Sequence, residues 1–254
     1  MGAIAVAGLA LATASLAQAV SVQSEGVRIA VFAQIKPHKL PRTETAPIAV
    51  SVAGPLEATD GTIPPQLREM TVEVNRHGVL QRKGLPSCPP QKLRAASSEK
   101  ALELCGGALI GSGRFWAHIV LPEQGSYPTR GELLIFNSKK QGKPIVLAHI
   151  FTSDPFDSAF TIAFSIRQLA KGPYGTELHA SLPEALGTWG YVDRIKLNLK
   201  REYQYKGRTL SYFNASCPAP KGVKRTPFHL AKATLSFAEL SLTATIDKDC
   251  GVKG

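Results

Sequence analysis

Six basic side chains lie between residues 194 and 208, and Glu202 is the one acidic residue among them. The start of this stretch alternates in polarity, which predicts a strand with its lysines and Asn198 on one face. A positively charged sheet face attracts polyanions, more weakly as salt rises. The alternative is a solvated face without a partner. The candidate residues for binding an anionic surface are Arg194, Lys196, Lys200, Arg201, Lys206 and Arg208.

Three histidines fall in predicted strands: His118, His149 and His179. Such side chains could ligate a metal or transfer protons if the fold brought them together, and Asp154 and Asp157 closely follow His149. Strand parity instead gives His118 and His149 apolar companions on their own strands, which favours semi-buried imidazoles bonded to the backbone. We therefore expect no metal site from these three residues.

Sequence motifs for nucleophilic or nucleotide chemistry are absent. The stretch Gly111-Ser112-Gly113 lacks the leading glycine of GxSxG and precedes a predicted strand where a helix is required, so its glycines favour a bend or bulge. There is no HExxH, P-loop or GxGxxG. Among 19 acidic residues, no carboxylate pair for glycoside hydrolysis stands out. We expect no catalytic residue and no cofactor.

Two aromatic residues, Trp189 and Tyr191, lie in the glycine-rich stretch 186–192. Such rings can stack on the face of a sugar, and they can equally cap one end of a hydrophobic core. Two rings do not make a platform, so we favour the role in the core.

Four cysteines, Cys88, Cys105, Cys217 and Cys250, are spread singly along the chain. Zinc ligands occur as closely spaced pairs, so this spacing favours two disulfides over a zinc site. Of the three possible pairings we favour the sequence-local one, Cys88–Cys105 with Cys217–Cys250. In the loop-entropy model each crosslink restricts the unfolded chain by about 3–4 kcal/mol. Disulfides in turn indicate an oxidising compartment.

Residues 1–19 carry no charged side chain, run apolar from Ala3 to Ala12 and end in Ala17-Gln18-Ala19. Small residues at −3 and −1 suit signal peptidase, so we expect a signal peptide cleaved after Ala19, although a basic residue at its start is missing. The apolar run is too short for a membrane anchor, and no later stretch approaches the length of a span. We expect the remaining chain, with its net charge of +11, to be secreted or held in the cell envelope.

Short strand signals recur along the rest of the chain. Residues 20–84 are extended and rich in proline, which limits pairing within a sheet. Residues 192–205 are expected as one strand, with a tight turn at Lys206-Gly207. The one convincing helix is Ser97–Cys105, which has a serine cap and ends at Gly106. We expect Ala101, Leu102 and Cys105 to share one face of it.

Eight or more short strands with one short helix predict an all-β protein, an antiparallel β-sandwich or jelly-roll-like domain. Helical segments between strands, which a parallel α/β fold needs, are missing. We divide the chain into a signal peptide (1–19), an extended N-terminal segment that contributes edge strands (20–84) and a main β-sandwich (85–254). The last two form one structural domain.

Five short stretches are distinctive: Leu85-Pro-Ser-Cys88, Ala108-Leu-Ile-Gly-Ser-Gly113, Phe136-Asn137, Gly172-Pro-Tyr-Gly-Thr176 and Ser216-Cys-Pro-Ala-Pro220. Over roughly Leu40 to the C-terminus the chain resembles a family of exported proteins of unknown function from high-GC soil actinobacteria of the Solirubrobacter kind. The resemblance implies export and a bacterial source. It implies no activity, ligand or catalytic residue.

These observations favour a non-catalytic binding module for anionic or glycan surfaces outside the cytoplasm. An anionic cell-wall polymer or glycan suits that compartment, whereas nucleic acid does not. The alternative is a secreted hydrolase that acts on polysaccharide and whose site only the fold assembles.

Overall fold

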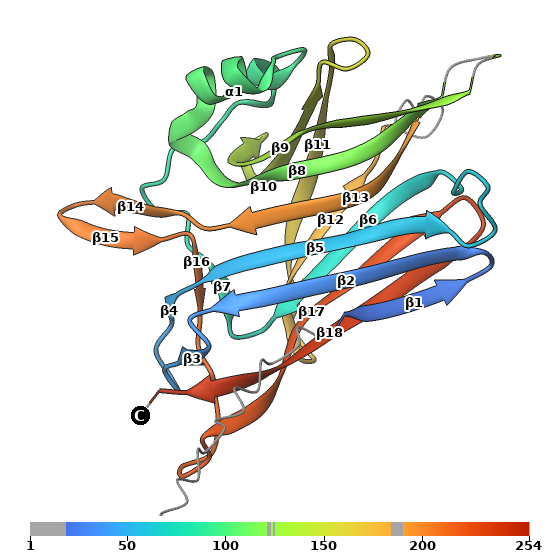
Figure 1. Ribbon diagram of the computed structural model, residues 1–254. Coiled ribbons are helices and arrows are strands. Elements are labelled where there is room, and N and C mark those ends of the chain that lie inside the picture. Colours follow the sequence, from blue (N-terminus) through green and yellow to red (C-terminus); the bar gives the residue numbers. More distant parts are fainter. Residues whose placement is uncertain (1–18, 121–122, 124, 184–189, 254) are drawn as a thin grey trace, which may run out of the picture.

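A computed structural model describes residues 19–120, 123, 125–183 and 190–253 of the protein (Figure 1). The expected signal peptide, apart from Ala19, lies outside these residues, as does Trp189.

The N-terminal strands are β1 (Val20–Ser24), β2 (Val27–Lys36), β3 (Lys39–Leu40), β4 (Ala46–Pro47), β5 (Ala49–Ala58), β6 (Leu67–Asn75) and β7 (Gly78–Leu80). Helical residues follow as 3₁₀ turns at Pro90–Leu93 and Gly106–Ala108 on either side of α1 (Ser98–Cys105). The remaining strands are β8 (Leu109–Val120), β9 (Ser126–Lys140), β10 (Lys143–Thr152), β11 (Ser158–Gln168), β12 (Tyr174–Ser181), β13 (Gly190–Leu199), β14 (Glu202–Tyr205), β15 (Arg208–Ser211), β16 (Phe213–Ala215), β17 (Arg225–Phe237) and β18 (Ser241–Val252).

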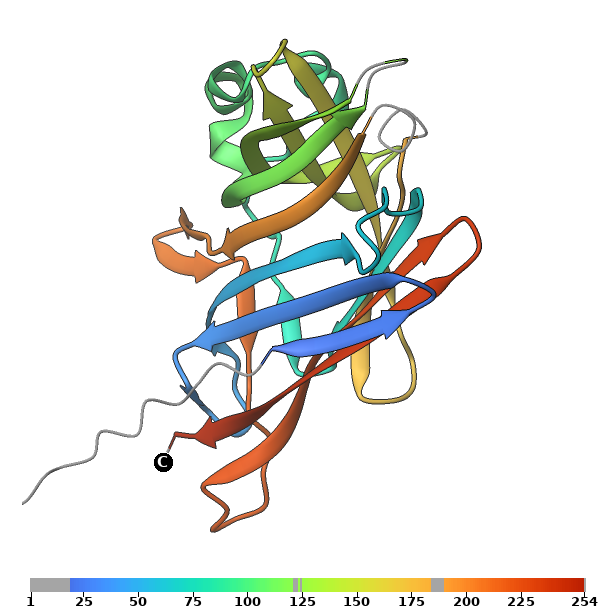
Figure 2. The same ribbon diagram turned by 45° about the vertical axis from the view of Figure 1, so that its right-hand side comes forward.

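Thirteen strands form one large sheet in the order β1-β2-β5-β13-β8-β9-β10-β11-β12-β6-β17-β18-β3. Every pairing is antiparallel except that of β18 with the short β3. The sheet curls, so that apolar residues of β2 pack against those of β17 and β18 from its other end (Figure 2). The predicted all-β, sandwich-like architecture with one short α-helix is therefore confirmed.

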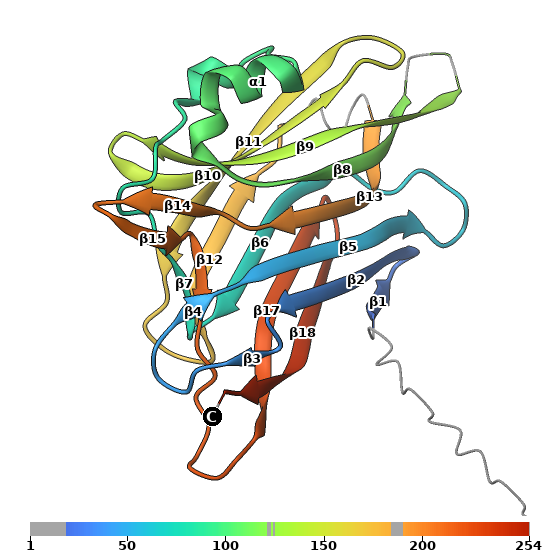
Figure 3. The ribbon, with the colours of Figure 1, turned by 60° about the vertical axis from the view of Figure 1, so that its left-hand side comes forward.

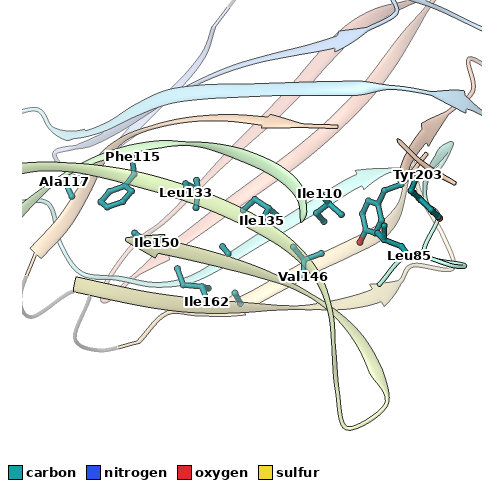
Figure 4. Packing of buried hydrophobic residues seen from close by; sticks show 13 residues of the cluster. Leu85, Ile110, Phe115, Ala117, Leu133, Ile135, Val146, Ile150, Ile162 and Tyr203 are labelled. Atoms are coloured by element: carbon teal, nitrogen blue, oxygen red, sulfur yellow. The ribbon is translucent and has the colours of Figure 1, made fainter. Parts of the chain in front are cut away.

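The inner face of the curled sheet holds the largest apolar cluster (Figure 4). Its residues alternate along each strand with outward-facing ones, as the two-residue period of a strand requires. In β8, for example, Phe115 and Ala117 are buried inside while Arg114 points the other way and is exposed. Burial on the inner face therefore determines which side chains the strands present to solvent.

A segment comprising residues 85–108 covers one part of the outer face (Figure 3). The Cys88–Cys105 disulfide joins the two ends of this segment, with 5.3 Å between the Cα atoms, and confirms the predicted pairing. Helix α1 begins as predicted, because the Ser97 hydroxyl accepts a hydrogen bond from the Lys100 amide at 3.2 Å. The prediction for Leu102 is wrong: its side chain is exposed, and Ser98 takes the buried place beside Ala101.

The second disulfide, Cys217–Cys250, lies in another apolar cluster with 6.0 Å between the Cα atoms, again as predicted. It ties the chain after β16 to the C-terminal strand β18. Among the described residues no cysteine is free.

The basic stretch differs from its prediction in one respect, since it is not a single strand. Strand β13 ends at Leu199, and β14 pairs with β15 in a separate two-stranded hairpin whose turn is Lys206-Gly207. Between β13 and β14, the guanidinium of Arg201 donates to the Gly107 carbonyl at 3.0 Å. The basic residues are thereby divided between the sheet and the hairpin.

Residues 20–84 supply strands at three places in the large sheet. Strands β1, β2 and β5 form one end of it, β6 lies between β12 and β17, and the short β3 pairs with β18 at the other end. Within the part of the chain that the structure describes, no helix has the length and apolar character needed to cross a membrane.

Candidate functional site

The outer face of β13, β8 and β9 carries a group of charged residues around one tryptophan. In the strand register Trp116 lies between Arg194 on β13 and Arg130 on β9. The next outward row places Arg114 between Lys196 and Glu132. Neighbouring strands are about 4.8 Å apart and the two rows about 7 Å apart. We call this group the basic face: Arg114, Trp116, Arg130, Glu132, Arg194 and Lys196.

The four cations of the basic face are exposed, and none has an ion-pair partner among the described residues. All four are solvent-exposed, while Trp116 is half-buried between them. The Arg194 guanidinium lies over the indole ring, 5.8 Å from its centroid, within reach of a cation–π interaction. Among the residues that the structure describes, no carboxylate forms an ion pair with any of these four cations. Their charge is therefore available to a ligand.

Two features of the chain create this face. The segment 85–108 covers Leu134 and Phe136 farther along β9, and leaves Arg130 and Glu132 open. In β8, a Cβ atom on Gly113 would overlap the carbonyl oxygen of Lys196, so glycine permits the close pairing of β8 with β13. The register of β8 with β9 shifts between Leu109 and Gly111, at the start of the strand where the sequence analysis expected a bend or bulge.

The other predicted basic residues lie beyond this face. Lys200 is 3.5 Å from the Glu202 carboxylate, and Arg201 bonds to the backbone of the α1 segment. Lys206 and Arg208 are exposed on the β14–β15 hairpin, where the Lys206 ammonium lies 5.7 Å from the centroid of the Tyr205 ring. The structure thus brings two of the six predicted residues, Arg194 and Lys196, into one group with cations that the sequence analysis did not select.

Arg114, Arg130 and Trp116 were missed because each stands singly in its own strand. Strand parity alone could have placed Arg114 and Trp116 on one face of the strand that became β8. It could not have placed that face beside β13, because a pairing between strands some 80 residues apart leaves no local mark in a sequence.

The three histidines do not converge. His179 on β12 contacts the Thr71 hydroxyl, with 3.1 Å between Nδ1 and Oγ1. His149 on β10 is fully buried, facing the segment 85–108. No group of three His, Cys, Asp or Glu side chains that could hold a metal ion occurs among the described residues.

His118 has a more elaborate environment than its sequence suggested. Its ring stacks on Tyr191 at 5.0 Å between centroids, and its Nδ1 is 3.3 Å from a carboxylate oxygen of Asp193. Burial, followed by the charge of Asp193, raises the pKa of Tyr191 above its usual value, so the phenol remains neutral at physiological pH. Tyr191 thus contacts a strand residue, while its predicted companion Trp189 lies outside the described residues.

No protein-family model, curated protein or solved structure matches this chain. The function is therefore inferred from the geometry of the basic face itself.

Proposed function

We propose that this protein is a non-catalytic binding module whose basic face holds an anionic glycan or cell-wall polymer. The observation that carries the proposal is the cluster of four unpaired cations around Trp116. Arginine guanidinium groups bind carboxylates and phosphates through two parallel hydrogen bonds, which a lysine cannot do. The half-buried indole of Trp116 adds an aromatic surface against which part of a sugar ring can pack.

The charge balance supports an anionic ligand. Like charges directly opposite one another destabilise a sheet, and Arg114 stands opposite Lys196. Glu132 lies on the other side of Arg114 but forms no ion pair with it. A polyanion laid across both rows would remove this repulsion and release the counterions held by the face.

We further propose that the protein acts outside the cytoplasm. Two disulfides support this location, because such crosslinks persist in oxidising compartments. The apolar leader with its small-residue cleavage site supports export.

Binding to immobilised polygalacturonate, with neutral dextran as the comparison, tests the proposal. We expect the protein to be retained on the acidic polymer and to elute as NaCl rises from 50 to 300 mM, because salt screens charges on an exposed face. The double variant Arg114→Glu/Lys196→Glu should lower the affinity at least about tenfold, since each reversal replaces an attraction with a repulsion.

The matched control is Lys139→Glu/Lys140→Glu, which changes the net charge by the same amount. These lysines are exposed at the β9–β10 hairpin, and Lys140 is about 33 Å along β9 from Arg130. The control variant should keep most of the affinity. Equal losses in the two double variants would reduce the effect to net charge and refute a specific face, as would salt-independent retention.

A secreted polysaccharide hydrolase is the second candidate, and the His118–Asp193 pair is the observation that favours it. The His118 Nδ1 atom lies 3.3 Å from the carboxylate without a hydrogen bond of normal geometry, and a histidine beside a carboxylate is a pair that can transfer protons. Release of reducing ends from acidic polysaccharides tests this function. Activity that His118→Gln abolishes would establish the hydrolase, and an inactive wild-type protein that binds the polymer would eliminate it.

A further inference from the structure

A cavity lies on the inner side of the sheet and is separate from the basic face. It is a cavity of about 280 Å³ between β8, β10, β11 and β13, just below the range of about 300–1,000 Å³ that is usual for small-molecule sites. Apolar side chains supply most of its wall: Phe115, Ala117, Ile150, Phe156, Phe160 and Val192. Figure 4 shows Phe115, Ala117 and Ile150 at this end of the core.

The two threonine hydroxyl groups in the wall already have partners. The Thr129 and Thr152 hydroxyls are 2.8 Å apart. The Thr129 hydroxyl donates to the Asp154 carbonyl at 2.5 Å, and that of Thr152 to the Arg130 carbonyl at 3.0 Å. Both hydroxyl hydrogens thus have backbone acceptors, so neither threonine is left to pair with a polar ligand.

The charge around the cavity excludes an anion. His118, which also lines it, is already paired with Asp193, and no lysine or arginine is among the described lining residues. A carboxylate or phosphate placed here would lose its water without gaining a free cation, which is strongly unfavourable. The complement of this wall is therefore a neutral hydrocarbon group.

Phe156 extends the apolar wall to the surface. Its side chain is 48% exposed although it lines the cavity. An exposed aromatic ring at the entrance of an apolar cavity gives a hydrophobic ligand a continuous path from solvent to the interior.

We propose that this cavity binds the hydrocarbon chain of a small neutral lipid-like molecule. Burial of apolar surface drives the binding, at about 25 cal/mol for each Å² removed from water. The hydrocarbon chain of the ligand lies against the inner face of β8 and β13, whereas an acidic polymer lies on the outer face of the same strands. The two sites are independent, and this inference does not rest on the proposed glycan binding.

Fluorescence titration of the full chain with N-phenyl-1-naphthylamine, a neutral hydrophobic dye, tests this site. We expect saturable enhancement at one dye per protein and competition by 1-decanol. Competition by 1,10-decanediol should be about tenfold weaker, because a second hydroxyl would enter an apolar site.

Ala117→Phe fills the cavity and should weaken dye binding at least about tenfold, an effect of the size that small changes in the volume of an apolar pocket produce. The matched control Ala163→Phe places the same ring at an exposed position of β11 that does not line the cavity, and it should bind the dye normally. Phe156→Ser changes an exposed residue and should weaken binding even if Ala117→Phe does not fold.

The basic-face variant Arg114→Glu/Lys196→Glu should bind the dye as the wild type does. Failure of the wild type to bind the dye would overturn the proposal. Binding that neither Ala117→Phe nor Phe156→Ser reduces would also overturn it. A wild-type dimer that Phe156→Ser converts to monomers, with no dye bound, would instead assign the cavity to a second copy of the chain.

Discussion

His149 provides a direct test of how the segment 85–108 covers the sheet. Its side chain has 0% exposure. Neither ring nitrogen makes a hydrogen bond of normal geometry with a described residue. Burial lowers the pKa of His149, and a backbone group of Ala96 offsets only part of this effect. The imidazole is therefore held neutral and poorly satisfied inside the protein.

The perturbation is His149→Leu, a replacement of similar volume without polar atoms. A buried donor or acceptor left without a partner costs about 1–3 kcal/mol. Removing both nitrogens should therefore stabilise the protein by about 1–3 kcal/mol at pH 7.5. Leu134, its partner on β9, already provides apolar surroundings.

The acid dependence follows from the direction of the pKa shift. Because the folded-state pKa of His149 lies below its usual value of about 6.5, the unfolded chain binds the proton more readily. Wild-type stability is thus complete above about pH 6.5 and is lost as the pH falls towards the lowered pKa, by up to about 1.4 kcal/mol per pH unit. Between pH 6.5 and 5.0 this amounts to at most about 2 kcal/mol. His149→Leu lacks this loss.

Urea unfolding of the disulfide-intact protein at pH 7.5 and 5.0 measures both effects. The advantage of His149→Leu over the wild type should widen at the lower pH. His38→Leu removes an exposed imidazole and serves as the control. A destabilised His149→Leu protein, with a difference from wild type that is the same at both pH values, would show that the imidazole is well satisfied and refute the reasoning.

Two further predictions concern the framework of the site. Replacing Cys217 and Cys250 with alanine should lower the free energy of unfolding by about 3–4 kcal/mol, because their crosslink spans 33 residues. Denaturant unfolding measures the loss, and a change below about 1 kcal/mol would contradict the loop-entropy argument. Gly113→Ala should destabilise the protein by about 1–3 kcal/mol and weaken polygalacturonate binding, because the new Cβ collides with the Lys196 carbonyl. Gly106→Ala, whose Cβ meets nothing within 4 Å, is the control for unfolding and binding, and equal behaviour of the two variants would count against the close β8–β13 approach.

Local features of the structure could be predicted from the sequence. The serine cap and the glycine after Cys105 define α1 through contacts within a few residues. Sequence proximity selected both disulfide pairings, since short loops favour neighbouring cysteines. The two-residue period of β13 likewise placed Arg194 and Lys196 on an exposed face. The signal peptide remains a prediction.

Strand pairing was decided by the tertiary structure. Arg114, Trp116 and Arg130 join Arg194 and Lys196 only because β8 pairs with β13 on one side and β9 on the other. Such register depends on which apolar faces are buried together across the whole sheet, and the period of a single strand does not specify its neighbour.

The same distinction applies to the buried and recessed sites. Parity correctly gave His149 apolar neighbours on its own strand, but only the position of the segment 85–108 buries it completely. The cavity needs four strands of the curled sheet and the Phe156 ring. By itself the sequence determined the alternation of apolar and polar residues along the strands, the helix cap, the crosslinks and the excess of positive charge, because these depend on nearby residues. Only the curling of the sheet, a balance of burial over distant segments, decided which charges gather and where the interior stays open.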